Sequence, residues 1–154
     1  MAAGRRPIKD VVAFNAAIDD DRVMEAIRAA EERTTGQIRV HISGRISKDV
    51  ERSARRRFAR LNMGATPDRN AVLIYVQPRT HRFFILGDVA FGELGGSALW
   101  EPAAARLSEE LKAGRYTEGL VGVVGYAGEV LARHFPAPDG GDAGPGLPDE
   151  ITGD

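Results

Sequence analysis

Two apolar segments that follow each other closely constrain the fold more than any other feature of this 154-residue chain. Residues 71–76 read Ala-Val-Leu-Ile-Tyr-Val, and residues 82–86 read Arg-Phe-Phe-Ile-Leu. Both are rich in β-branched and aromatic residues, which favour strands, and Pro78 marks a turn between them. Because the connection is too short for a crossover, the pattern predicts an antiparallel hairpin. The first segment is apolar without a break, so it is predicted to be a central strand buried on both faces.

A further strand is predicted upstream, where polar and apolar residues alternate strictly over residues 37–43. Such alternation is typical of a strand with one buried face and one wetter face. The predicted buried face consists of Ile38, Val40 and Ile42, and the polar face consists of Gln37, Arg39, His41 and Ser43.

Four amphipathic helices are predicted around these strands, because apolar residues recur at helical spacing in four segments. Approximately, these are residues 21–34, residues 47–62, a segment from Pro102 to Gly114, and residues 116–134. The second helix separates the upstream strand from the hairpin, which permits a parallel crossover. The expected fold class is therefore α/β, with a mixed sheet, a β-α-β-β core and two C-terminal helices.

The two ends of the chain lack such patterns. Residues 1–13 are expected to form a flexible N-terminal segment, and residues 14–136 the α/β domain. After Pro136 the composition shifts to Asp, Gly and Pro. Because such a segment has little apolar surface to bury, residues 137–154 are expected to be a disordered acidic tail.

Composition excludes several classes of function. The net charge of −1 argues against a globally basic nucleic-acid binder. The absence of cysteine excludes disulfides, thiolate catalysis and cysteine zinc sites. No apolar run of the length of a secretory signal follows the polar residues 1–10. The longest weakly polar stretch, residues 119–132, is shorter than the roughly 20 residues that span a bilayer. We therefore expect a cytoplasmic protein without a transmembrane segment.

One candidate ligand pocket follows from the predicted sheet. Ligands of open α/β sheets tend to bind beyond the carboxyl ends of the strands. A polar pocket is predicted from Arg39, His41, Asn70 and Asp88. Arg39 would hold an anion as a bidentate donor, and His41 would serve as an acid or base near neutral pH. In the alternative interpretation, Arg39 and His41 form the wet face of an edge strand and Asp88 caps a turn.

A second candidate surface is the strongly basic helix within residues 45–60. It carries seven cations against two acidic residues, an excess of five. Its predicted partner-binding residues are Arg52, Arg55, Arg56 and Arg60. An acidic partner protein is one interpretation, and an ordinary solvated helix face is the other. Nucleic acid is not expected, because stacking aromatic residues are not interleaved with the cations and Phe58 lies on the apolar stripe.

No known catalytic signature occurs in the sequence. The phosphate-cradling Gly-x-x-x-x-Gly-Lys pattern, His-Glu-x-x-His and Gly-x-Ser-x-Gly are all missing. The three histidines are His41, His81 and His134, and none has a partner at metal-ligand spacing. No metal site and no catalytic residue is therefore predicted from the residues themselves.

The order of several short strings resembles the TPM domain, a family named after a thylakoid lumen protein, a photosystem repair factor and a nematode receptor regulator. The matching strings cover residues 26–31, 34–41, 69–76, 84–88, 119–120, 134–136 and 147–151. The chain resembles most the short stand-alone bacterial members. The resemblance implies a Rossmann-like α/β/α sandwich. It also implies a function of one of two kinds, since both are attributed to members of the family. One is a non-enzymatic interaction or assembly module, and the other is an acid phosphatase-like hydrolase or a calcium-binding domain.

One position departs from the family pattern. The resemblance implies Asp-(Asp or Asn)-Gly before the central strand, whereas this chain reads Arg69-Asn70-Ala71. A cation in place of a carboxylate would repel Ca²⁺ unless Asp68 takes over. No cofactor is therefore expected, and calcium binding is weakened as an implication of the family. Another protein is the expected partner.

Overall fold

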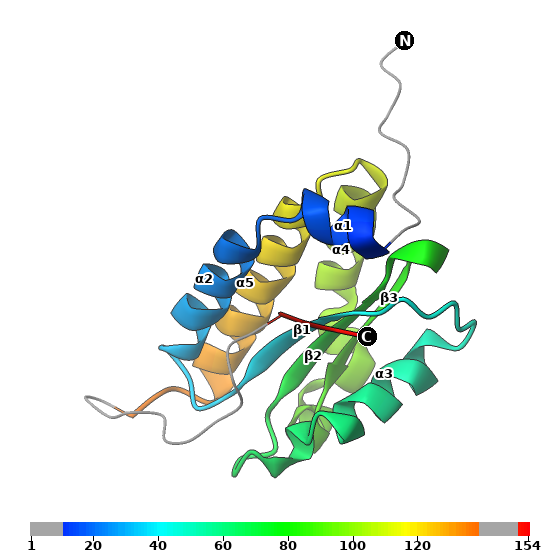
Figure 1. The fold of residues 1–154 in the computed structure, drawn as a ribbon. Helices are drawn as coiled ribbons and strands as arrows, with labels where there is room; N and C mark the ends of the chain where they lie inside the picture. The colour runs from blue at the N-terminus through cyan, green and yellow to red at the C-terminus, as the bar shows by residue number, and fades with distance from the viewer. Residues whose placement is uncertain (1–10, 139–150) are drawn as a thin grey trace.

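The computed structural model describes residues 11–138 and 151–154, and it has helices on both faces of a four-stranded sheet (Figure 1). The helices are α1 (Val11–Ala17), α2 (Asp20–Glu31), α3 (Val50–Arg60), α4 (Glu101–Lys112) and α5 (Tyr116–His134). The strands are β1 (Ile38–Ile42), β2 (Val72–Gln77), β3 (Arg82–Gly87) and β4 (Ile151–Gly153). Short 3-10 helices are η1 (Met63–Ala65), η2 (Pro78–Thr80), η3 (Val89–Leu94) and η4 (Gly96–Trp100).

The predicted hairpin and crossover are both confirmed. The strands are ordered β3-β2-β1-β4 across the sheet. β2 and β3 pair antiparallel, with Ile74 opposite Ile85. β1 and β2 pair parallel, with Val40 opposite Ile74, and α3 lies in the crossover between them. The sheet is therefore mixed, as the α/β assignment requires.

Two hydrophobic clusters lie on opposite faces of the sheet. The larger one joins the sheet to α2, α4 and α5, and Val40 and Val124 are buried within it. The smaller one lies between the sheet and α3, and Leu73 and Tyr75 are buried within it. Figure 1 shows α3 on one side of the sheet and α2, α4 and α5 on the other. This confirms the α/β/α arrangement that the resemblance implied.

The C-terminal segment differs from the expectation. Ile151–Gly153 forms β4 and pairs parallel with β1, so the prediction of disorder up to residue 154 is wrong there. The short strand is stabilised by the backbone ladder along β1, which the local composition does not reveal. Residues 139–150 of the predicted tail lie outside the described residues.

The N-terminal prediction also needs correction. Val11–Ala17 is helical, so the last three residues of the predicted flexible segment belong to α1. Residues 1–10 lie outside the described part of the chain. Phe14 on α1 is buried, and its ring contacts that of Tyr116 on α5 with centroids 4.9 Å apart. Among the described helices, none has the length and apolar character that crossing a membrane requires.

Candidate functional site

The four residues of the predicted pocket do not meet. β1 and β2 run in the same direction, so Asn70, just before β2, lies at the opposite end of the sheet from His41, near the end of β1. Asp88 follows β3, which runs the other way, and therefore shares the end that Asn70 occupies. Arg39 lies opposite Leu73 and thus between the two ends. The proposed four-residue pocket is wrong as a single site.

The alternative interpretation of the polar face is also wrong in part. Arg39 is 4% exposed and His41 1% exposed, so neither belongs to a wet surface. β4 pairs with Val40–Ile42 along the outer side of β1, so β1 is an interior strand of the sheet, and the His41 ring also stacks on Tyr75 of β2. All five residues of β1 are accordingly buried. Asp88, in contrast, does cap a turn, because its side chain accepts the backbone N–H of Val89 at 2.7 Å.

At the Asp88 end, the carboxylate is held by a neighbouring guanidinium. The Arg69 side chain donates from Nε and one terminal nitrogen to the two oxygens of Asp88, at 2.7 Å and 2.9 Å. The hydrogen bond to Asp88 and its negative charge raise the pKa of Arg69 above its ordinary value. Arg69 has a left-handed backbone, with φ of 51°. A bidentate pair of this kind fixes the orientation of both side chains.

Asn70 belongs to a separate polar chain at the same end. Its side-chain N–H donates to Thr35 Oγ1 at 3.1 Å, and the Thr35 hydroxyl donates to Asp68 at 2.8 Å. Asn70 is fully buried, and within the described residues its Oδ1 has no hydrogen-bond partner. Asp68 therefore faces Thr35 rather than Asp88.

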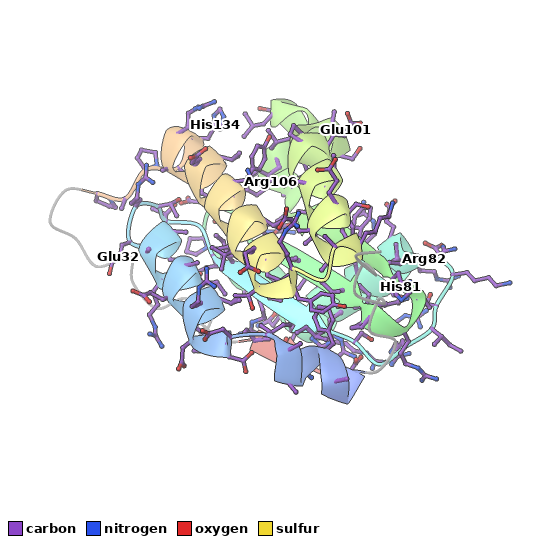
Figure 2. All side chains as sticks on the ribbon, turned by 90° about the horizontal axis from the view of Figure 1, so that it is seen from above. Glu32, His81, Arg82, Glu101, Arg106 and His134 are labelled. Carbon is purple, nitrogen blue, oxygen red and sulfur yellow. The ribbon has the colours of Figure 1, made fainter. Side chains whose placement is uncertain are left out.

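These residues do not fit a calcium ion at the position that the family pattern implies. Ca²⁺ takes six to eight oxygen ligands, but the two carboxylate oxygens of Asp88 are both occupied by Arg69. Within residues 11–138 and 151–154, no three His, Asp or Glu side chains converge in a way that would hold a metal. Figure 2 shows His81 on the side of the molecule away from His134.

At the opposite end, His41 is part of a network that the sequence did not predict. Its Nδ1 lies 2.8 Å from Thr152 Oγ1, and its ring stacks on Tyr75 with centroids 5.7 Å apart. Its Nε2 lies 3.5 Å from Asp154, which accepts from Arg57 at 2.6 Å. Thr152 and Asp154 were missed because β4 was expected to be disordered. The apolar Ile151 after a Gly- and Pro-rich stretch was the available signal.

Burial controls the electrostatics of this network. Burial lowers the pKa of His41 below 6.5, and the charge of Arg57 acts in the same direction, while Asp154 opposes both. Burial would raise the pKa of Asp154, but the hydrogen bond from Ser43 and the charges of His41 and Arg57 outweigh it and lower that pKa. At neutral pH His41 is therefore uncharged and Asp154 ionised, so the network serves to hold β4 against β1 and α3.

The basic helix is α3, and its four predicted residues are all exposed. Arg55 pairs with Glu51 one turn earlier, at 2.9 Å. Within the described part of the chain, no ion pair forms at Arg52, Arg56 and Arg60. Arg57 differs from these residues because it turns toward Asp154. The N-terminus of α3 is capped by Asp49, which accepts the backbone N–H of Arg52 at 3.0 Å.

A groove that the sequence did not predict lies between α3 and the loop that carries η3 and η4. Its volume is ≈ 440 Å³, and its floor is the outer edge of β3 from Phe84 to Asp88. One wall comes from α3 through Arg55 and Phe58, and the other comes from η4 through Trp100. Residues 91–96 on this side of the groove are rich in glycine.

These features define an α/β domain whose buried polar residues serve the fold and whose α3 side is exposed, basic and grooved. Comparisons with known proteins specify the class. The sequence matches the TPM domain over residues 12–130. The chain therefore belongs to the TPM-domain family.

One solved structure is similar over nearly the whole chain. It is the NMR structure of the BA42 protein from the psychrophilic bacterium Bizionia argentinensis, a short stand-alone bacterial protein. The two are 33% identical, with a TM-score of 0.78, and the match covers 88% of this chain and 92% of that protein. No curated protein matches the chain.

Proposed function

We propose that this TPM domain is a non-enzymatic interaction module that binds an acidic partner protein through the outer face of α3. The observation that carries the proposal is the row of exposed arginines on α3, in which Arg52, Arg56 and Arg60 have no ion-pair partner among the described residues. Unpaired guanidinium groups on one helix face are well suited to carboxylates on another protein. The cytoplasm remains the expected location.

Two polar side chains of the predicted pocket are engaged within the fold. Asp88 is held by Arg69, and His41 is buried in the contact with Thr152. Neither side chain faces the other, because they lie at opposite ends of the sheet. This arrangement favours the interaction module over the acid phosphatase-like alternative.

The proposal is tested with a fluorescent poly-glutamate peptide as a probe of defined chemistry. The double variant Arg56→Glu/Arg60→Glu is compared with Arg28→Glu/Arg133→Glu, which changes the net charge equally on exposed positions of α2 and α5. We expect saturable binding that weakens with added salt. Binding is expected to be lost in the α3 variant and retained in the control.

Two results would contradict the proposal. Equal weakening in both double variants would show that only overall charge matters. Turnover of a generic phosphomonoester by the unaltered protein, lost on Arg39→Ala or Asp88→Asn, would favour the hydrolase. The assay is run at acidic and at neutral pH, because an acid phosphatase requires the former.

A further inference from the structure

The groove beside β3 has a hydrogen-bonding floor, because β3 is an edge strand. Among the described strands, which are ordered β3-β2-β1-β4, β3 has a neighbour on one side only. An antiparallel edge strand directs the backbone groups of every second residue away from its neighbour. Such groups provide a template for one more strand.

The register identifies which residues point outward. The Asp88 N–H donates to Ala71 O at 2.9 Å, so this facing pair is hydrogen-bonded across the strands. The pattern alternates, and Leu73 faces Leu86 and Tyr75 faces Phe84. Phe84, Leu86 and Asp88 therefore bond to β2. The backbone N–H and C=O groups of the residues between them point into the groove.

Two outward-facing residues, Ile85 and Gly87, lie on the groove floor. Within residues 11–138 and 151–154, no hydrogen bond reaches their outward backbone groups. The groove follows β3 from Phe84 to Asp88. At about 3.3 Å per residue, this length fits an extended segment of about five residues.

The walls specify which side chains such a segment would carry. Along a strand, side chains alternate between the two faces of the sheet. On the α3 face, the added strand would meet Phe58 and the exposed cation Arg55. On the other face it would meet Phe91 and Trp100, whose rings contact each other with centroids 5.3 Å apart. An alternation of acidic and apolar residues matches this pair of walls.

Trp100 adds a directional donor to the floor. Its indole Nε1 lies 3.2 Å from where a Cβ on Gly87 would stand. The Nε1–H has no hydrogen-bond partner among the described residues. An indole N–H next to an unpaired strand edge is suited to a carbonyl or carboxylate oxygen of a bound peptide.

We infer that the edge of β3 binds an extended segment of the acidic partner by strand addition, with acidic side chains toward Arg55 and apolar side chains toward Trp100. The inference rests on the proposed function and names how the partner is recognised. Strand addition combines backbone hydrogen bonds for affinity with alternate side chains for specificity. The partner is thus a protein with an exposed acidic, β-prone segment.

The test uses the full chain and a capped six-residue peptide in which valine alternates with glutamate. Trp100 is the single tryptophan of the sequence, so its fluorescence reports on the groove directly. We expect a saturable change in that fluorescence, with the largest amide NMR shifts at Ile85 and Gly87. Two N-methylated peptides, modified at odd or at even residues, distinguish the two edges of the added strand. One pattern is expected to weaken binding about tenfold or more, since two hydrogen bonds are lost, and the other is expected to bind normally.

Two glycine-to-glutamate variants are matched so that a loss of binding is not explained by a loss of folding. A Cβ at Gly92, in the groove, or at Gly125, on α5, would meet no other atom within 4 Å, and neither residue has a positive φ. Gly92→Glu places a negative charge in the groove, whereas Gly125→Glu places one on α5, which contributes no residue to the groove lining. We expect Gly92→Glu to weaken peptide binding about tenfold, as electrostatic repulsion and lost space both oppose it. Gly125→Glu is expected to leave it unchanged.

The outcomes separate the inference from the proposed function. If poly-glutamate binds α3 but the alternating peptide leaves Ile85, Gly87 and Trp100 unperturbed, the groove inference is overturned and the interaction module stands. Equal binding by both N-methylated peptides, or equal weakening by the two glycine variants, also overturns strand addition. Loss of poly-glutamate binding as well would overturn the proposed function.

Discussion

The two edge strands of the sheet differ in how far they are protected from pairing with a strand of another protein. At one edge, β4 is only three residues long and is held by Thr152, which contacts His41, and by Asp154 just after the strand, which contacts Arg57. At the other edge, β3 is six residues long and borders a groove, and no described residue bonds to the outward backbone groups of Ile85 and Gly87 on its floor. A very short edge strand is one way in which proteins block unwanted pairing. The long edge is therefore the one available to a partner.

The polar residues of this protein have two different roles: some stabilise the fold, and others are available for binding. His41 and Arg39 are the residues that sequence reasoning assigned to chemistry, yet both are buried inside the sheet. Arg52, Arg55, Arg56 and Arg60 formed the second candidate surface, and all four are exposed. Polar or charged residues within a strand can therefore contribute to the packing of a neighbouring strand, whereas charged side chains without an ion-pair partner at the surface indicate binding.

The largest expected effect comes from removing residues 151–154, which deletes β4 and the partners of His41. We expect the free energy of unfolding to fall by about 3 kcal/mol, because the backbone ladder of β4 and the buried contact of Thr152 with His41 are lost and a hydrogen bond contributes about 1 kcal/mol. Urea unfolding measures this change. Ser97→Ala in the groove wall is the control, with an expected change below about 0.5 kcal/mol. An unchanged stability of the shortened chain would contradict the role of β4.

Acid should weaken the β4 edge through His41. Because burial lowers its pKa below 6.5, the folded protein binds fewer protons at this site than the unfolded chain. This contribution to stability is fully present above pH 6.5 and is lost as the pH falls toward the folded pKa. Asp154 acts in the same direction only at lower pH, because its pKa lies below 3.8.

The variant His41→Gln tests this dependence, since glutamine does not titrate. Between pH 7 and pH 5.5 we expect the unaltered protein to lose more stability than the variant, because only the unaltered protein has a group at this position whose pKa burial lowers. Urea unfolding at the two pH values gives the comparison. Parallel losses in both proteins would mean that His41 is not the group responsible.

The smallest expected effect is that of calcium on the melting temperature, through the carboxylate of Asp88 at the end of β3. Since Arg69 occupies both oxygens of Asp88, millimolar Ca²⁺ should leave the melting temperature unchanged. The variant Arg69→Asp removes the competing cation and places a carboxylate at the position where the family pattern has Asp. A Ca²⁺-dependent rise in melting temperature of the unaltered protein would show that the ion binds despite Arg69.

Much of the fold follows from the sequence, because its strands and helices have strong local patterns. The apolar runs of β2 and β3 and the short turn at Pro78 were sufficient to predict the hairpin. β4 was missed because three residues carry almost no periodicity and pair with β1 across more than 100 positions of chain. The candidate pocket failed for a topological reason: parallel β1 and β2 place His41 and Asn70 at opposite ends.

The groove was not predictable from local patterns. Its walls come from α3 and η4, which are far apart in the sequence, and its floor depends on β3 being at the edge. A hairpin pattern indicates that two strands pair, but it does not show which strand has a second neighbour. The exposed arginines of α3 were predictable because a helix with one apolar stripe exposes its other faces.

Amide hydrogen exchange at β3 tests the central claim most directly, because it reads the outward and inward backbone groups of one strand together. We expect fast exchange at Ile85 and Gly87 and strong protection at Leu86, which bonds to β2. Adding the alternating valine–glutamate peptide should slow exchange at Ile85 and Gly87 and leave Leu86 as it was. Equal protection of all three without the peptide, or no change when it is added, would contradict an open strand edge as the binding surface.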